Sequence, residues 1–163
     1  MANAIHLFLE SQPNTLIKGA SDRVGRKGSI EVISHDHTLF SPTDDNTGNW
    51  TGSHVHSPFK FTKALDPATT YLIKALTTKQ TLSSAEFRFY RGNNAGMEEA
   101  YYIVRLEQVK VVKISPKMYD MKDPAFEKYD YVEMVELRYE KIIWTYVDGQ
   151  LTHSDSWNER QVG

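Results

Sequence analysis

The stretch PFKFTKALDPATTYLIKALTTKQ, residues 58–80, passes from an alternating strand pattern into a helical pattern, and the rest of the chain can be arranged around it. Phe59 and Phe61 lie two positions apart, and Lys60 and Thr62 take the alternate positions. Successive side chains of a strand point to opposite faces, so the two phenylalanines share one face and the polar residues share the other. The first part of the stretch therefore predicts a half-buried strand.

The second part of the stretch carries the signals of a helix over about residues 67–79. Asp66 has a side chain preferred at the N-cap, where a carboxylate accepts hydrogen bonds from the free N–H groups of the first turn. Pro67 suits the first helical position because its missing N–H would have no partner there. An apolar stripe at helical spacing consists of Ala68, Leu72, Ile73, Ala75 and Leu76. This pattern predicts one helix packed against strands.

The segments after this helix predict long strands. Residues 86–91 alternate ahead of the hairpin turn sequence GNNAG at residues 92–96. In residues 97–115, and again in residues 131–147, the apolar positions change parity partway along the segment. A β-bulge or a sharp bend in a strand produces such a change. Two bent long strands indicate a β-barrel, so the expected fold is mainly β with one lateral helix.

The length and composition of the chain exclude several classes of protein. We expect one domain, residues 1–163, because 163 residues fit a single core. The absence of cysteine excludes disulfides and thiolate metal sites. A net charge of -2 argues against a nucleic-acid-binding protein, since such proteins are usually basic. Residues 1–13 lack the basic region of a signal peptide, and no segment is long and apolar enough for membrane insertion.

Residues 41–53, SPTDDNTGNWTGS, predict a long polar loop. Loops of this length in compact domains are usually functional or disordered. Trp50 in this loop has two interpretations: it belongs to a contact surface for a partner, or it folds back onto its own domain. Composition leaves both open. Residues 116–129 predict a second long loop, and residues 150–163 predict a polar tail.

Two His-X-His pairs are candidates for a metal site: His35 with His37, and His54 with His56. In a strand, residues two apart project from the same face about 6.7 Å apart, so two pairs on neighbouring strands could converge on a metal. A metal site also needs carboxylates that orient the rings, and Asp36, the carboxylate near them in sequence, points to the opposite face. We therefore interpret the histidines as polar residues of strand faces and expect no metal and no other cofactor.

The sequence contains no recognisable catalytic constellation. There is no cysteine and no Gly-X-Ser-X-Gly motif, so nucleophilic catalysis has no support. The carboxylates of Glu98, Glu99, Glu133 and Glu136 lie in charged strand and turn contexts, for which a solvated face is the expectation rather than acid–base catalysis. We expect that the protein is not an enzyme.

Four segments of the chain carry a resemblance to a known family. They are GRKGSIEVISHDH at residues 25–37, FKFTKALDPATTYLIKAL at residues 59–76, YYIVRLEQVKVVKIS at residues 101–115, and VELRYEKIIWTYVDG at residues 135–149. In order and spacing they resemble Hcp, the haemolysin-coregulated protein that forms the inner tube of the bacterial type VI secretion system. His37 matches the histidine of that family's strand, whereas His35, His54 and His56 depart from its pattern.

The resemblance implies a flattened antiparallel β-barrel with a lateral helix, assembled as a homohexameric ring whose copies stack into a tube. It implies partners for that tube: a spike protein at its tip, a contractile sheath around it and effector proteins in its lumen. It also implies synthesis in the bacterial cytoplasm and secretion without a signal peptide. The loop at residues 41–53 would take part in ring stacking, through Thr43, Asp44, Asp45, Asn46, Asn49 and Trp50.

Two other functions are compatible with the residue patterns. A barrel with one lateral helix could be a carrier of small apolar molecules, which a ligand-binding cavity in the monomer would reveal. The histidine pairs could belong to a metal enzyme, which elemental analysis of the purified protein would reveal.

Overall fold

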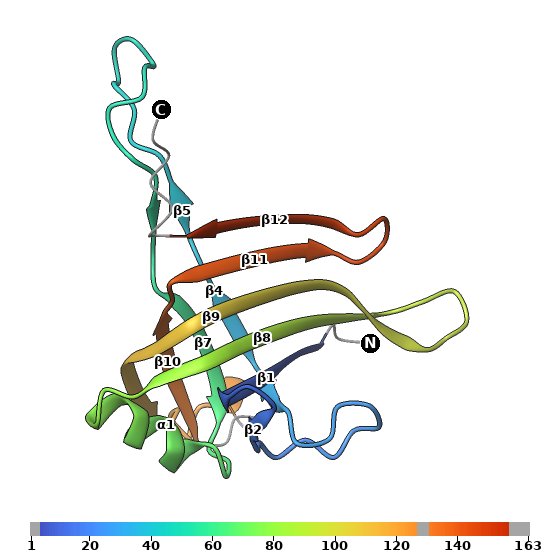
Figure 1. The fold of residues 1–163 in the computed structure, drawn as a ribbon. Helices are drawn as coiled ribbons and strands as arrows, with labels where there is room; N and C mark the ends of the chain where they lie inside the picture. Colours follow the sequence, from blue (N-terminus) through green and yellow to red (C-terminus); the bar gives the residue numbers. More distant parts are fainter. Residues whose placement is uncertain (1–3, 127–130, 157–163) are drawn as a thin grey trace.

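The computed structural model describes residues 4–126 and 131–156 (Figure 1). In chain order its elements are β1 (Ala4–Gln12), β2 (Thr15–Ile17), β3 (Ile30–Val32), β4 (Ser34–Asp36), β5 (Leu39–Phe40), β6 (Val55–His56), β7 (Phe59–Ala64), α1 (Thr69–Thr77), β8 (Thr81–Gly92), β9 (Glu98–Lys117), the 3-10 helix η1 (Pro124–Phe126), β10 (Val132–Arg138), β11 (Lys141–Tyr146) and β12 (Leu151–Ser156). Neither of the two helices in these ranges is long and apolar enough to cross a membrane.

Most of the strands form one curved antiparallel sheet, with α1 at one end of it (Figure 1). The order along the sheet is β2-β1-β8-β9-β10-β7-β4. The long strand β9 pairs with β8 on one side; on the other side it pairs with β10 and, further along, with β11. β12 then pairs with β11. β9 is therefore the strand that joins the two halves of the sheet through backbone hydrogen bonds.

Residues 30–36 connect the two ends of this curved sheet. Their first part, β3, pairs with β1, and their second part, β4, pairs with β7. Between the two parts, the N–H of Ile33 donates to the carbonyl oxygen of Thr62 over 2.8 Å. One short segment thus brings β1 and β7 together, although the ladder does not run round the sheet without a break. The predicted fold class, a flattened β-barrel with one lateral helix, is confirmed.

The change of parity predicted for residues 97–115 is present in β9. Leu106 and Val109 are both fully buried although they have opposite parity. Gln108 between them has a φ of 53°, a left-handed conformation that re-aims the side chains after it. A second irregularity lies at Val112, where the register with β10 shifts. These two irregularities bend β9, so its two halves pair with different strands.

The prediction of one long strand over residues 131–147 is wrong. The structure has two strands there, β10 and β11, separated at Tyr139 and Glu140. β10 pairs with residues 110–117 of β9, and β11 pairs with residues 102–107. The chain breaks because each strand follows one half of the bent β9. The parity change in this sequence therefore marks a break between strands rather than a bend within one.

The predicted tail and second loop also differ from the structure. Within residues 150–163, Leu151–Ser156 form the strand β12, because the backbone groups of β11 on that side accept a further strand. Within residues 116–129, β9 continues to Lys117 and the 3-10 helix η1 forms at Pro124–Phe126. Residues 127–130 and 157–163 lie outside the described residues.

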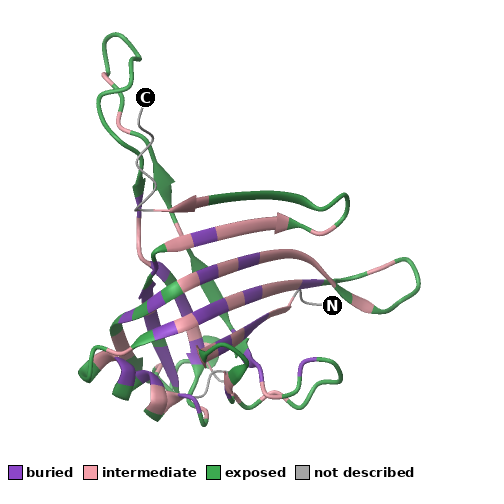
Figure 2. Ribbon diagram, viewed as in Figure 1, coloured by how far each residue is buried: buried purple, intermediate pink, exposed green. Residues whose placement is uncertain are grey.

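Buried side chains of the strands form one hydrophobic core. The buried residues alternate with less buried ones along the strands (Figure 2). The ring centroids of Phe59 and Phe87 lie 4.4 Å apart, and those of Phe61 and Phe87 lie 5.4 Å apart. α1 adds Leu72 and Ala75 to this core. Ile73 is 42% exposed, so the apolar stripe of the helix is narrower than predicted. Burial of this face accounts for the lateral position of α1.

Lys63 and Glu133 form a fully buried ion pair, so the prediction that Glu133 lies on a solvated face is wrong. Both side chains are 0% exposed, and Lys63 Nζ lies 2.5 Å from Glu133 Oε1. The two residues are direct partners in the register of β7 and β10. The cause is the alternation of side chains along the strand. Glu133 lies two residues before Val135 and four before Leu137, which point into the core, so its side chain points to the same face.

The prediction of Asp66 as the N-cap is wrong in position. α1 begins at Thr69, and its N-cap residue, Ala68, provides no side-chain hydrogen bond. The helix is preceded by a turn. In this turn the N–H of Thr69 donates to the carbonyl oxygen of Asp66 over 3.1 Å. The Oδ1 atom of Asp66 accepts hydrogen bonds from the N–H of Ala68 at 2.9 Å and from Lys63 Nζ at 2.8 Å. Asp66 therefore stabilises the turn before the helix and the buried lysine.

Replacing Asp66 by alanine should lower the free energy of unfolding by about 1–2 kcal/mol, because the Ala68 N–H and the Lys63 ammonium each lose an acceptor. Asp66→Asn keeps an acceptor for the N–H but removes the charge, so its loss should be smaller. Urea denaturation of both variants measures these differences, with the exposed Asp22→Ala as the control. Equal midpoints for wild type and Asp66→Ala would contradict the assigned role.

Candidate functional site: a projecting arm and its anchor

Residues 38–57 form an arm that projects away from the barrel, at the end opposite α1 (Figure 1). Near the barrel the arm is a short two-stranded sheet, in which β5 pairs with β6. Further out, the N–H of Thr51 donates to the carbonyl oxygen of Pro42 over 3.0 Å, and Thr43 forms a bridge with Trp50. The loop predicted at residues 41–53 is therefore the outer part of an ordered hairpin.

The tip of the arm is held by its own hydrogen bonds. The Oδ1 atom of Asp44 accepts from the N–H groups of Asn46 and Thr47, at 2.8 and 2.9 Å. These two hydrogen bonds lower the pKa of the Asp44 carboxyl, and the bond from Thr47 has the larger effect. Gly48, with a φ of 73°, donates its N–H to the Asp44 carbonyl oxygen over 2.8 Å. These bonds give the tip a defined shape without a hydrophobic core.

Large apolar side chains on the arm remain in solvent. Leu39, Phe40, Trp50 and Val55 are 43, 55, 75 and 38% exposed. Asp45, Asn46 and Asn49 on the same arm are also exposed, and most of the arm is green in Figure 2. Trp50 does not fold back into the core, so one of its two sequence interpretations is wrong. An ordered segment with exposed apolar groups is typical of a contact surface.

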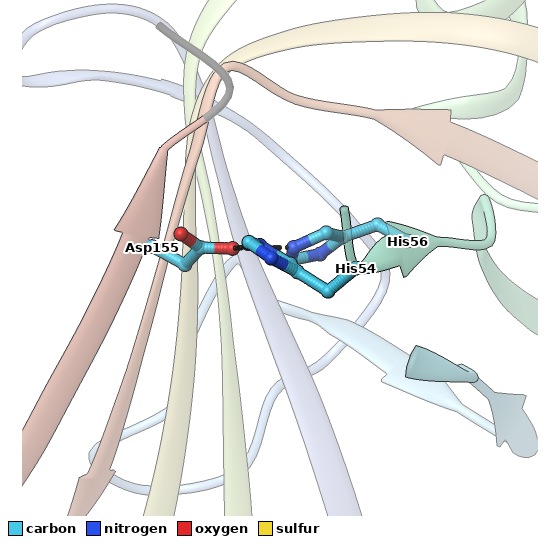
Figure 3. A group of neighbouring side chains, drawn as sticks. All are labelled: His54, His56 and Asp155. Atoms are coloured by element: carbon cyan, nitrogen blue, oxygen red, sulfur yellow. Dashed lines mark hydrogen bonds and ion pairs between the residues drawn. The ribbon is translucent and has the colours of Figure 1, made fainter. Parts of the chain in front are cut away.

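A network of polar side chains anchors the arm to the barrel, and Figure 3 shows three of its members, His54, His56 and Asp155. The Oδ2 atom of Asp155, on β12, lies 2.5 Å from His54 Nε2 and 2.6 Å from His56 Nε2. On its other side, His56 Nδ1 lies 2.6 Å from the hydroxyl of Tyr139, and that hydroxyl lies 2.8 Å from His37 Nε2. We call these five residues the anchor network.

Burial and neighbouring groups shift the pKa values of three members of the anchor network, His37, Tyr139 and Asp155. Burial, with a smaller contribution from the charge on His56, lowers the pKa of His37 to about 4. His37 is therefore neutral near pH 7. Burial raises the pKa of Tyr139, so its hydroxyl keeps its proton. Partial burial tends to raise the pKa of Asp155, but the hydrogen bonds from His56 and His54 outweigh it and the net shift is downward.

The structure groups the four histidines differently from the arrangement considered in the sequence. His54 and His56 share one carboxylate partner, and His37 joins them through Tyr139. His35 takes no part: its ring stacks on Phe59, with centroids 5.0 Å apart. No sequence signal pointed to Asp155, because it follows His56 by 99 residues. The apolar residues that flank the loop, Leu39 and Val55, could have indicated the hairpin.

Comparison with known proteins identifies the family. Residues 8–146 match the family described as "Type VI secretion system effector, Hcp". The chain is 33% identical over 145 residues to the "Major exported protein" of Pseudomonas aeruginosa, covering 89% of this chain and 84% of that protein.

Solved structures agree with this match. Hcp1 from the E. coli EAEC 042 pathovar, as a double mutant, is 49% identical with a TM-score of 0.86, covering 96% of this chain and 99% of that one. "Secreted protein Hcp3" from Pseudomonas aeruginosa is 25% identical with a TM-score of 0.72, over 96% of this chain and 99% of that one. The chain therefore belongs to the Hcp family of type VI secretion proteins.

Proposed function

We propose that this chain is a secreted structural protein that forms the inner tube of a type VI secretion system. The observation that carries the proposal is the arm, an ordered hairpin with exposed apolar side chains on a member of the Hcp family. The names "Major exported protein" and "Secreted protein Hcp3" of two relatives support export. We propose that the protein has no enzymatic activity.

In this proposal six copies form a ring through a head-to-tail interface. β12 supports such an interface because, among the described residues, β11 is its one strand partner, and residues 151–154 are exposed, Leu151 to 67%. An exposed strand edge favours pairing with another chain. Head-to-tail contacts close into a ring when the rotation between neighbours divides a full turn.

The arm is the proposed contact between rings. Trp50, the most exposed tryptophan of the described residues, would bury its ring against the next ring, and the polar residues Thr43, Asp44, Asp45, Asn46 and Asn49 would surround that contact. A central aromatic group with a polar rim is the usual anatomy of an interface. The tube would then carry effector proteins in its lumen, with a spike protein at its tip and a contractile sheath around it.

The alternative function as a small-molecule carrier has less support. A carrier barrel needs an interior cavity, whereas Phe59, Phe87 and Leu106 are at most 1% exposed and belong to one packed core. Because the interior is filled, the structure favours a role as a structural subunit of an assembly over a role as a carrier with a ligand-binding cavity.

The purified protein should be a hexamer in dilute solution, with a mass six times the 18.7 kDa of one chain. Light scattering at micromolar concentration measures this mass, and electron microscopy should show rings in end view. A mass of one chain across the concentration series would contradict the proposal. Rings of another subunit number would contradict the hexamer but not the tube.

A further inference from the structure

Three groups with the chemistry of metal ligands converge where the arm meets β12 (Figure 3). They are His54, His56 and Asp155, each of which offers one ligand atom, and these three atoms lie within 4.8 Å of one another. The Nε2 atoms of both histidines lie next to Asp155 Oδ2. The two histidines come from the returning side of the arm, and the carboxylate comes from a strand at the margin of the barrel. Two imidazoles and one carboxylate form a common ligand set for Zn²⁺ in proteins.

The residues behind these ligands also suit a metal site. Metal-bound histidine usually donates its other ring N–H to an oxygen, which fixes the orientation of the ring. His56 Nδ1 lies 2.6 Å from the Tyr139 oxygen, and the Tyr139 hydroxyl lies 2.8 Å from His37 Nε2. In this arrangement the Tyr139 hydroxyl can donate a hydrogen bond to His37 Nε2 while its oxygen accepts one from His56 Nδ1.

We propose that His54, His56 and Asp155 bind one Zn²⁺ ion or a similar borderline divalent cation. Tyr139 orients His56 from behind, and the cation connects the arm to β12. The sequence predicts no metal here because Asp36, the carboxylate near the histidines, points to the opposite face, and the structure supplies a carboxylate from a distant strand. The pairing of His35 with His37 takes no part in this site.

The site needs a small rearrangement to accept the ion. Ligand atoms of a tetrahedral zinc site lie roughly 3.3 Å apart, given metal–ligand distances near 2 Å. The nitrogen–oxygen distances here are 2.5 and 2.6 Å, so the ligands must separate by less than about 1 Å. The His54 side chain is 53% exposed and can move, whereas His56 is 4% exposed and held by Tyr139. The exposed side leaves room for water to complete the coordination.

The test is titration of the untagged, chelator-treated full chain with Zn²⁺ by calorimetry and with Co²⁺ by absorption. We expect one ion per chain, and a Co²⁺ spectrum of tetrahedral or five-coordinate type. Asp155→Asn and His54→Ala should each weaken Zn²⁺ binding at least about tenfold. Tyr139→Phe should weaken it less, because a ligand keeps its position but loses its orienting partner.

The matched control is His153→Ala, which removes a histidine of β12 that is not a proposed ligand; its ring stacks on Trp144, and the ring of Trp144 stacks on His56. It should bind Zn²⁺ as the wild type does. Absence of saturable binding, or equal binding by wild type and His54→Ala, would overturn the proposal. Because the His54 side chain lies half in solvent, this variant should fold, and it decides the question alone if Asp155→Asn does not fold.

Discussion

Replacing Glu133 by alanine should destabilise the fold by about 3–5 kcal/mol, because it leaves the ammonium group of Lys63 buried without its closest charge partner. Lys63 Nζ would keep the Asp66 carboxylate at 2.8 Å and the Thr69 hydroxyl at 3.1 Å. It would also keep the Ala64 carbonyl oxygen at 3.1 Å. The Asp66 carboxylate lies in the turn before the helix and the Thr69 hydroxyl at its first residue, so the loss should loosen the attachment of α1 to β7 and β10. Chemical denaturation of the variant measures the effect.

The matched control for this prediction is Glu136→Ala. Glu136 lies on the same strand, but its ion pair, to Lys113 at 3.5 Å, is at the surface, where the lysine side chain is 65% exposed. Exposed pairs contribute about 0–1 kcal/mol, so this variant should unfold close to wild type. Equal losses of unfolding free energy for the two variants would show that burial of the Lys63 pair does not determine its contribution to stability.

A double replacement separates the cost of breaking the pair from the value of having it. Lys63→Met with Glu133→Leu removes both charges and keeps similar volume, and such exchanges are often neutral or stabilising. The Oε2 atom of Glu133 is buried and has no hydrogen-bond partner among the described residues, which adds to the cost of the native pair. We expect the double variant to be more stable than Glu133→Ala. A double variant as unstable as the single one would contradict this.

Replacing residues 43–50 by a short Gly-Ser turn should abolish ring stacking and secretion while leaving the hexamer intact. These residues form the outer part of the arm, held by their own hydrogen bonds, and Trp50 is 75% exposed. Their removal takes no side chain from the core. The thermal midpoint should stay near that of wild type, because loop length has only a logarithmic effect on the entropy of closure.

Electron microscopy of concentrated protein measures stacking, and light scattering measures the hexamer. The control is a similar shortening of the turn at residues 92–96, which lies between β8 and β9 and not on the arm; it should leave stacking unchanged. If the shortened arm prevents folding or ring formation, the arm belongs to the barrel or to the interface within the ring. Normal stacking and secretion would show that the arm has no such role.

Local sequence was enough for the faces of the strands, the approximate position of the helix and the polar character of the arm. Alternation places Phe59 and Phe61 toward the core because a strand repeats every two residues. The same rule, applied to Lys63 and Glu133, predicts that both point inward. The charge of Glu133 favours solvent, but its parity places it inside, where the ammonium group of Lys63 compensates the charge.

Tertiary structure alone decided how distant segments meet. Three features depend on the register between strands that are far apart in sequence. They are the joining of β1 to β7 through residues 30–36, the pairing of Lys63 with Glu133, and the approach of Asp155 to His54 and His56. Periodicity shows which face a side chain takes but not which residue lies opposite it, because the hydrogen-bond ladder that sets the register is formed by non-local backbone groups. The sequence by itself therefore determined the kind of fold and the polar character of residues 41–53, and the register of the folded chain decided the buried ion pair, the hairpin of the arm and its anchor.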